Sequence, residues 1–128
     1  REYIEDVEGN PTIYNGMPLR TEFRAFVDCD KNEVIGIVPY WNPLVMKRAL
    51  SAGLSSSMEQ DYQTYLQHED KLMYEFNHYL PRVRKAIEYL LPELHLNGQY
   101  SIDVMKNGDD LYLIDMALMS NSALTELL

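Results

Sequence analysis

The stretch that decides the fold is LRTEFRAFVD, residues 19–28 of a 128-residue chain. Apolar and polar residues alternate along it, which predicts a β-strand with two distinct faces. The two predicted faces carry Phe23, Ala25 and Val27 on one side and Glu22, Arg24 and Phe26 on the other. A polar turn follows, and residues 33–40, rich in Val and Ile, predict a second strand. Together the two strands are expected to form a β-hairpin.

A second hairpin is predicted near the other end of the chain, with strands at 100–105 and 111–116 around a polar turn at 106–110. The segment from about residue 43 to about residue 97 is predicted to be a helical insertion between the two hairpins. It contains a short helix at 44–50, a long helix at about 58–79, and a third helix from Pro81 to about 91. Pro81 is expected to break or restart the helix because proline lacks the backbone N–H. Residues 1–8 predict a short strand, and 122–128 the start of a helix.

This order of elements predicts an α+β fold, with an antiparallel β-sheet built from hairpins and helices packed on one face. The length suits a single domain covering residues 1–128. The hydrophobic share of 46% and charged share of 24% are those of a globular protein rather than a disordered one.

The net charge of −9 argues against nucleic acid and membrane as partners, since both carry negative charge. A small anionic ligand is still compatible with this net charge if a divalent metal ion, held by carboxylates, makes the local electrostatic potential positive. The single Cys29 precludes an internal disulfide, and its acidic neighbours are expected to raise the pKa of its thiol. No apolar run is long enough to cross a membrane, so a cytoplasmic location is expected.

Two acids stand out because each interrupts an apolar strand: Asp103 in SIDVM and Asp115 in LIDMA. Burying an unpaired carboxylate is costly, so such an acid faces solvent, an arginine or a metal. An odd-length turn would place both carboxylates on one face, where they could hold Mg²⁺, whereas a two-residue turn would place them on opposite faces. The alternative is a pair of solvent-facing acids on an amphipathic hairpin.

Arg24 is the candidate cation of the first hairpin. Its guanidinium could bind a phosphate or a carboxylate. Alternatively, it could form a surface ion pair with Glu22, which lies on the same predicted face.

Taken in order, three stretches resemble the C-terminal half of an ATP-grasp domain, in particular the cell-division-cycle type and related phage or bacterial clades. Residues 1–5, REYIE, resemble the hinge strand that receives adenine, with Glu2, Tyr3 and Ile4 at the hinge and Glu5 at the ribose. The EFR-x-FV strand resembles the one whose arginine, here Arg24, faces the transferred phosphate. The strands with Asp103 and Asp115 resemble the pair that holds Mg²⁺.

The resemblance implies that the chain is the C-terminal portion of a larger protein that binds ATP and Mg²⁺. It further implies a carboxylate–amine ligase that acts through an acylphosphate on a small-molecule or peptide carboxylate. Arg24 would then be the catalytic residue. In the family an Asn commonly follows the second acid by two positions, but Ala117 stands here, so Asn121, or alternatively Ser120, from the following loop is the candidate third metal ligand. The alternative function is a nucleotide-binding assembly factor, or an interaction domain with a protein partner and no ligase activity.

Overall fold

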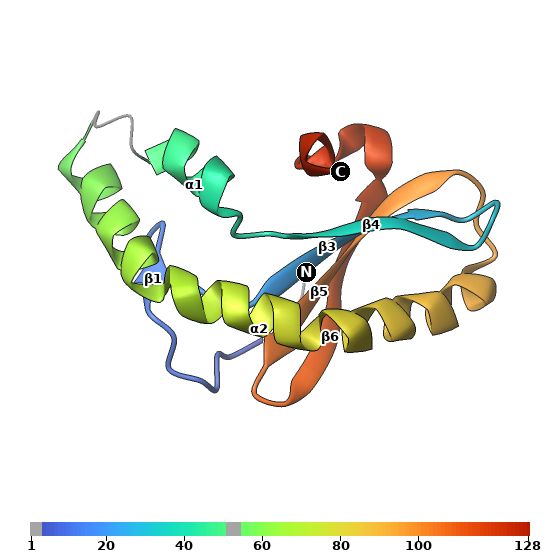
Figure 1. Ribbon diagram of the computed structural model, residues 1–128, viewed down its shortest axis with the longest axis horizontal. Helices are drawn as coiled ribbons and strands as arrows, with labels where there is room; N and C mark the ends of the chain where they lie inside the picture. Colours follow the sequence, from blue (N-terminus) through green and yellow to red (C-terminus); the bar gives the residue numbers. More distant parts are fainter. Residues whose placement is uncertain (1–3, 51–54) are drawn as a thin grey trace.

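The computed structural model describes residues 4–50 and 55–128, arranged as Figure 1 shows. In chain order the elements are β1 (Thr12–Ile13), β2 (Met17–Pro18), β3 (Glu22–Asp28), β4 (Glu33–Pro39), α1 (Pro43–Leu50), α2 (Ser56–Leu94), β5 (Gln99–Asn107), β6 (Asp110–Leu118), and the 3₁₀ helices η1 (Met119–Asn121) and η2 (Thr125–Leu127). Both predicted hairpins are present, β3 with β4 and β5 with β6.

The main sheet has four antiparallel strands in the order β4-β3-β5-β6, and β1 and β2 form a separate two-stranded sheet. β3 and β5 are distant in sequence but pair along their whole length, so they join the two hairpins into one sheet. The long helix α2 packs against this sheet. The predicted α+β class is therefore confirmed, but the helices do not all lie on one face, since Val45 of α1 packs with Phe26 and Val38 on the side away from α2.

The predicted alternation of residues 22–27 is also confirmed. Phe23, Ala25 and Val27 lie in the core between the sheet and α2, while Phe26 packs in a separate cluster on the opposite face. We call this opposite face, which also carries Arg24 of β3 and Asp103 of β5, the outer face. This face thus combines the charged side chains of two central strands with an apolar cluster around Phe26.

The helix α2 is continuous over 39 residues, so the predicted break at Pro81 was wrong. Side chains on both sides of this proline pack into the same core, with Phe76 before it and Val83 and Ile87 after it. Their burial holds the helical path despite the hydrogen bond that proline removes. Among the described residues, no helix has both the length and the apolar composition needed to cross a membrane.

The ends of the chain differ from the sequence predictions. The predicted strand at 1–8 begins outside the described residues, and Ile4–Glu8 form no strand. Residues 122–128 contain only the short turn η2, because Leu124 has a φ of 75°, which a right-handed helix cannot accommodate. The Leu124 side chain packs with Phe26 and Val38, so the C-terminal segment covers part of the outer face.

Candidate functional site

Three charged side chains form one row across the outer face. Arg24 on β3 is in register with Asp103 on β5, and Asp103 is in register with Asp115 on β6. Residues in register on neighbouring strands point to the same side of a sheet. The fold therefore brings together the arginine and the two acids that the sequence singled out.

The two acids share a face because of a β-bulge. The turn between β5 and β6 is Gly108–Asp109, and a regular hairpin with two turn residues would place Asp103 and Asp115 on opposite faces. However, Asp103 pairs with Asp115 while the next residue, Val104, pairs with Leu113, which leaves Ile114 as the extra residue of the bulge. The two carboxylates therefore lie on the same face, although the sequence predicted opposite faces for a two-residue turn.

The bulge has a clear cause in the packing of β6. Leu111 and Met116 would point to opposite faces in a regular strand, but both pack against the core under α2. The extra residue between them lets both side chains bury apolar surface. Core packing thus sets the register that aligns the acids.

Arg24 and Asp103 form a two-pronged ion pair. Arg24 Nε donates to Asp103 Oδ1, and Nη2 donates to Oδ2, both at 2.8 Å. The Nη1 group donates to the carbonyl oxygen of Ala123 at 3.3 Å, and the guanidinium carbon lies 5.2 Å from the ring centre of Tyr40. The hydrogen bonds to Asp103 raise the pKa of Arg24 against the opposing effect of burial. These contacts use three of the five N–H donors of the guanidinium and leave two.

The two carboxylates retain the capacity to bind a cation. Asp115 is exposed, and its Oδ1 accepts a hydrogen bond from the N–H of Met116 at 2.9 Å. Each carboxylate oxygen has two lone pairs, so Asp103 can accept from Arg24 and still offer a lone pair to a hard cation such as Mg²⁺. The fold therefore places two carboxylates side by side, Asp115 exposed and Asp103 only 8% exposed in its ion pair with Arg24.

The third predicted metal ligand, Asn121, lies in the exposed turn η1, and none of the hydrogen bonds between described residues joins it to either acid. Across residues 4–50 and 55–128, no group of three or more His, Cys, Asp or Glu side chains is placed to hold a metal ion. Of the three predicted metal ligands, the strand register therefore aligns two, Asp103 and Asp115.

The predicted hinge segment is held by side chains of the sheet. Glu2 and Tyr3 lie outside the described residues. The carbonyl oxygen of Ile4 accepts a hydrogen bond from Arg20 Nη1 at 2.6 Å. The carbonyl oxygen of Glu5 accepts one from Asn107 Nδ2 at 2.7 Å, and the N–H of Val7 donates to Asn107 Oδ1 at 2.9 Å.

Asn107 thereby pairs with the backbone of residues 5–7 as a neighbouring strand would. It has the same alternation phase on β5 as Asp103, so both belong to the outer face. They are four positions apart along the extended strand, a distance of roughly 13 Å. The hinge segment and the row of charges therefore lie at two ends of one surface.

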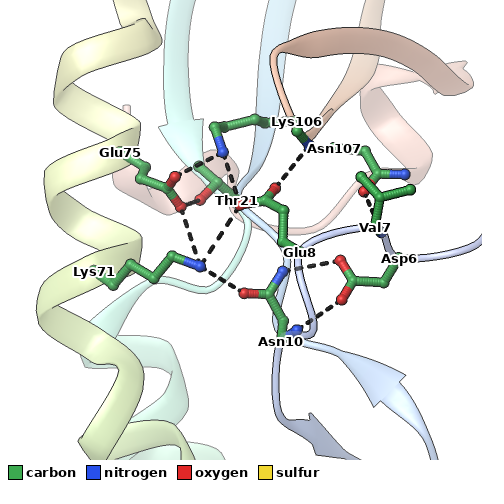
Figure 2. Close-up of polar contacts among 10 residues, drawn as sticks. Asp6, Val7, Glu8, Asn10, Thr21, Lys71, Glu75, Lys106 and Asn107 are labelled. Atoms are coloured by element: carbon green, nitrogen blue, oxygen red, sulfur yellow. Dashed lines mark hydrogen bonds and ion pairs between the residues drawn. The ribbon is translucent and has the colours of Figure 1, made fainter.

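A second group of charges, centred on Lys106, fixes the hinge segment to the rest of the fold (Figure 2). Lys106 Nζ lies 2.9 Å from Glu8 Oε1 and 2.7 Å from Glu75 Oε2, and its side chain is 5% exposed. Lys71 Nζ approaches the same two acids at 3.6 and 4.0 Å, and Thr21 Oγ1 donates to Glu75 Oε1 at 2.9 Å. These contacts join the N-terminal segment, β5 and α2.

The ionisation of this group follows from its hydrogen bonds. Burial favours the neutral form of Lys106, but its hydrogen bonds to Glu75 and Glu8 outweigh burial and raise its pKa. Burial likewise acts to raise the pKa of Glu75, but the hydrogen bonds from Lys106 and Thr21 lower it overall. Both groups are therefore held in their charged forms at neutral pH.

Lys106 and Asn107 were not predicted as functional residues because both were expected in the turn at 106–110. A signal was present: continuing the alternation of Ile102 and Val104 places Lys106 on the side that faces α2. A cation at a core-facing position predicts a carboxylate partner on the element packed against it. Glu75 of α2 is that partner.

Cys29 follows β3 and is 7% exposed. Burial, with added repulsion from Asp28 and Asp30, raises the pKa of its thiol. The direction agrees with the sequence prediction, although burial contributes more than the neighbouring acids. A thiol that stays protonated is a poor nucleophile, so Cys29 does not form a second reactive site.

Proteins of known family offer no guide to the chemistry of this surface. No family model, curated protein or solved structure matches the chain, so the function has to be inferred from the side chains of the outer face.

Proposed function

We propose that this chain is the ATP- and Mg²⁺-binding part of an ATP-grasp carboxylate–amine ligase-like enzyme. The observation that carries the proposal is the row of Arg24, Asp103 and Asp115 across three neighbouring strands of the outer face. One fixed guanidinium next to two carboxylates suits a metal-bound polyphosphate, because the acids bind the cation and the arginine binds the anion.

The donor set fits Mg²⁺. Asp103 and Asp115 supply the hard oxygen ligands that this ion prefers. When bound, the ion would neutralise charge on the phosphate oxygens. Arg24 would direct an unused N–H donor to the transferred phosphate, and Asp103 keeps the guanidinium in place by accepting from its Nε and Nη2.

The proposed reaction needs no nucleophile from this chain. A substrate carboxylate oxygen attacks the γ-phosphorus of ATP, the bond to ADP breaks, and an acylphosphate forms. An amine then attacks the acyl carbon, and inorganic phosphate leaves with the electrons of the carbon–oxygen bond. Arg24 stabilises the charge that develops on the phosphoryl oxygens, while the fixed geometry of the outer face orients the reactants.

The hinge segment supports the same proposal. Residues 4–7 are anchored on the outer face by Arg20 and Asn107, at roughly 13 Å from Asp103 along β5. A nucleoside triphosphate is long enough to extend over such a distance. The adenine would meet the backbone near Ile4, and the next residue, Glu5, would be the acid that binds the ribose.

The test is a titration of the ¹⁵N-labelled chain with Mn²⁺·ATP, followed by ¹H–¹⁵N NMR. Bound Mn²⁺ broadens the amide signals closest to it, so the signals of residues 102–104 and 114–116 should be lost first. Asp115→Asn should abolish this selective broadening. The matched control is Asp109→Asn, which removes an exposed acid from the turn of the same hairpin and should leave the broadening unchanged.

Broadening that is equal in the wild type and in Asp115→Asn would overturn the metal site. Chemical shift changes with ATP alone that are equal to those with Mg²⁺·ATP would show that the nucleotide binds without the two acids.

A second candidate function is an interaction domain for a protein partner. The observation that favours it is the exposure of two aromatic side chains on α2, with Tyr74 69% and Tyr89 85% exposed. Tyrosine is enriched in protein interfaces because it combines a large apolar ring with a polar hydroxyl. Pull-down from cell extract with the wild type and with a Tyr74→Ser/Tyr89→Ser variant tests it, since loss of a specific partner only in the variant is expected.

A further inference from the structure

A cavity of about 220 Å³ lies beside Arg24, at the end of the row of charges. Its walls come from four parts of the chain: residue 14, residue 24, residues 40–49 and residues 123–124. The lining residues used below are Tyr14, Arg24, Tyr40, Trp41, Ala49 and Leu124. Figure 1 shows α1, which carries Ala49, and the C-terminal turns η1 and η2, which flank Leu124 in sequence, on the side of β4 away from α2. The cavity therefore opens next to the outer face rather than in the core.

The walls of the cavity are mainly aromatic and apolar. The rings of Tyr40 and Trp41 meet edge to face, with centres 5.0 Å apart and planes at 88°, and the ring of Tyr14 lies 6.3 Å from that of Trp41. Leu124 closes the side formed by the C-terminal segment. Such walls favour a flat or branched apolar group over a sugar or another strongly hydrated group.

One charged group reaches the cavity wall, the guanidinium of Arg24. It has two N–H donors beyond those that bind Asp103 and Ala123. The Nε1–H of Trp41 has no hydrogen-bond partner within the described residues, but this atom is buried within the wall. A cationic guanidinium with an unused N–H favours an anionic acceptor such as a carboxylate.

We propose that this cavity binds a small carboxylate with one aromatic or branched apolar group, with the carboxylate on Arg24 and the apolar group between Tyr14, Tyr40 and Trp41. The size is suitable, because an apolar cavity of about 150 Å³ is enough to hold benzene, and the carboxylate needs the remainder. The identification of this ligand as the acyl donor rests on the proposed ligase function, whereas its binding in the cavity does not.

Trp41 is the only tryptophan in the sequence, so its fluorescence reports on the cavity directly. The experiment titrates the full 128-residue chain, without nucleotide, with phenylacetate, and then with phenylacetamide, which has the same shape but no charge. Phenylacetate should change the emission of Trp41 in a saturable way. Phenylacetamide should bind about tenfold or more weakly, because it loses a charge-assisted hydrogen bond.

A pair of matched variants locates the binding site. Ala49→Leu adds bulk at the cavity wall, on an exposed residue of α1 that has no polar contact to lose, and should weaken phenylacetate binding at least about tenfold, since overfilling a site excludes its ligand. Ala86→Leu makes the same change on an exposed position of α2, outside the cavity lining, and should bind phenylacetate as the wild type does.

The outcomes separate this inference from the proposed function. No saturable response to phenylacetate, an equal response to phenylacetamide, or unchanged binding in Ala49→Leu would each overturn the carboxylate cavity, whatever the result with Mn²⁺·ATP. If phenylacetate binds as expected but Mn²⁺·ATP does not act through Asp115, the cavity stands and its role in a ligase reaction is withdrawn.

Discussion

Replacing Lys106 with methionine tests the buried charge network most directly. Methionine keeps an unbranched apolar side chain next to the ring of Tyr79, which Lys106 Nζ approaches at 5.3 Å, so the change removes charge with little change in volume. It leaves Glu8 and Glu75 facing each other without their main cation, although their side chains are only 14% and 15% exposed.

The expected cost follows from these contacts. Removing one partner of a buried ion pair costs about 3–5 kcal/mol, because the other charge stays buried and unpaired. Lys71 remains at 3.6 and 4.0 Å from the two acids and shares part of their charge. We therefore expect Lys106→Met to lower the free energy of unfolding by about 3 kcal/mol, the lower end of that range.

The assay is urea denaturation followed by far-ultraviolet circular dichroism at pH 7. The matched control is Lys85→Met, which makes the same substitution at an exposed position of α2 and should change stability by less than about 0.5 kcal/mol. The double variant Lys106→Met/Glu75→Gln should recover about 1–2 kcal/mol of the loss, because one buried carboxylate is gone and the amide oxygen introduced in its place still accepts the hydrogen bond from Thr21.

The effect should also depend on pH in a defined direction. The pKa of Glu75 is lowered from 4.5, so its contribution to wild-type stability is full above pH 4.5 and is lost as the pH falls through the lower folded value. The pKa of Lys106 is raised from 10.5, so its contribution is full below that pH. The difference between wild type and Lys106→Met should therefore be constant near neutrality and shrink in acid.

Two results would refute this reasoning. One is a Lys106→Met variant that is no less stable than Lys85→Met, which would mean that the network contributes nothing. The other is a double variant that is no more stable than the single one, which would mean that the cost does not arise from unpaired carboxylates.

Three further predictions concern other parts of the fold. Pro81→Ala should raise the free energy of unfolding by about 1 kcal/mol or more, measured by urea denaturation, because alanine restores the N–H that the continuous helix α2 lacks at this position. Gly108→Ala should destabilise by about 1–2 kcal/mol in the same assay, since the residue has a φ of 64° and its new Cβ would lie 3.4 Å from Val7 Cγ2. Cys29 should react with iodoacetamide more slowly than free cysteine at pH 7.5, and the rate, followed by mass spectrometry, should keep rising above pH 9, because burial raises the pKa of its thiol from 9.0. A fast reaction at pH 7.5 would contradict the last of these.

The alternation of apolar residues was enough to predict the two hairpins and the α+β class. Residues 22–27 show why, because Phe23, Ala25 and Val27 are buried under α2 as their period of two predicts. The break at Pro81 was wrong because a local rule about proline does not include the burial of Phe76, Val83 and Ile87 along the sheet.

The candidate site was predictable in part. Arg24, Asp103 and Asp115 were candidates from the sequence alone. The hydrogen bonds from Arg24 to both carboxylate oxygens of Asp103 could not be predicted. This contact depends on the pairing of β3 with β5, whose two residues are 79 positions apart in sequence. The buried Lys106 and the cavity beside Trp41 were missed for the same reason. Each depends on side chains from several elements, and their assembly is fixed by tertiary packing rather than by local pattern.

The bulge at Ile114 couples the alignment of Asp103 with Asp115 to the stability of the protein. A slip of β6 by one residue would turn Asp115 away from Asp103, and it would also pull Met116 out of the core under α2. A molecule in which the acids are misaligned has thus lost hydrophobic burial as well, and it is disfavoured before any ligand is present. Conformations in which the two acids are misaligned are therefore less stable than the native fold and are little populated. Mutations that leave the core of this hairpin intact should also leave the spacing of its two acids unchanged.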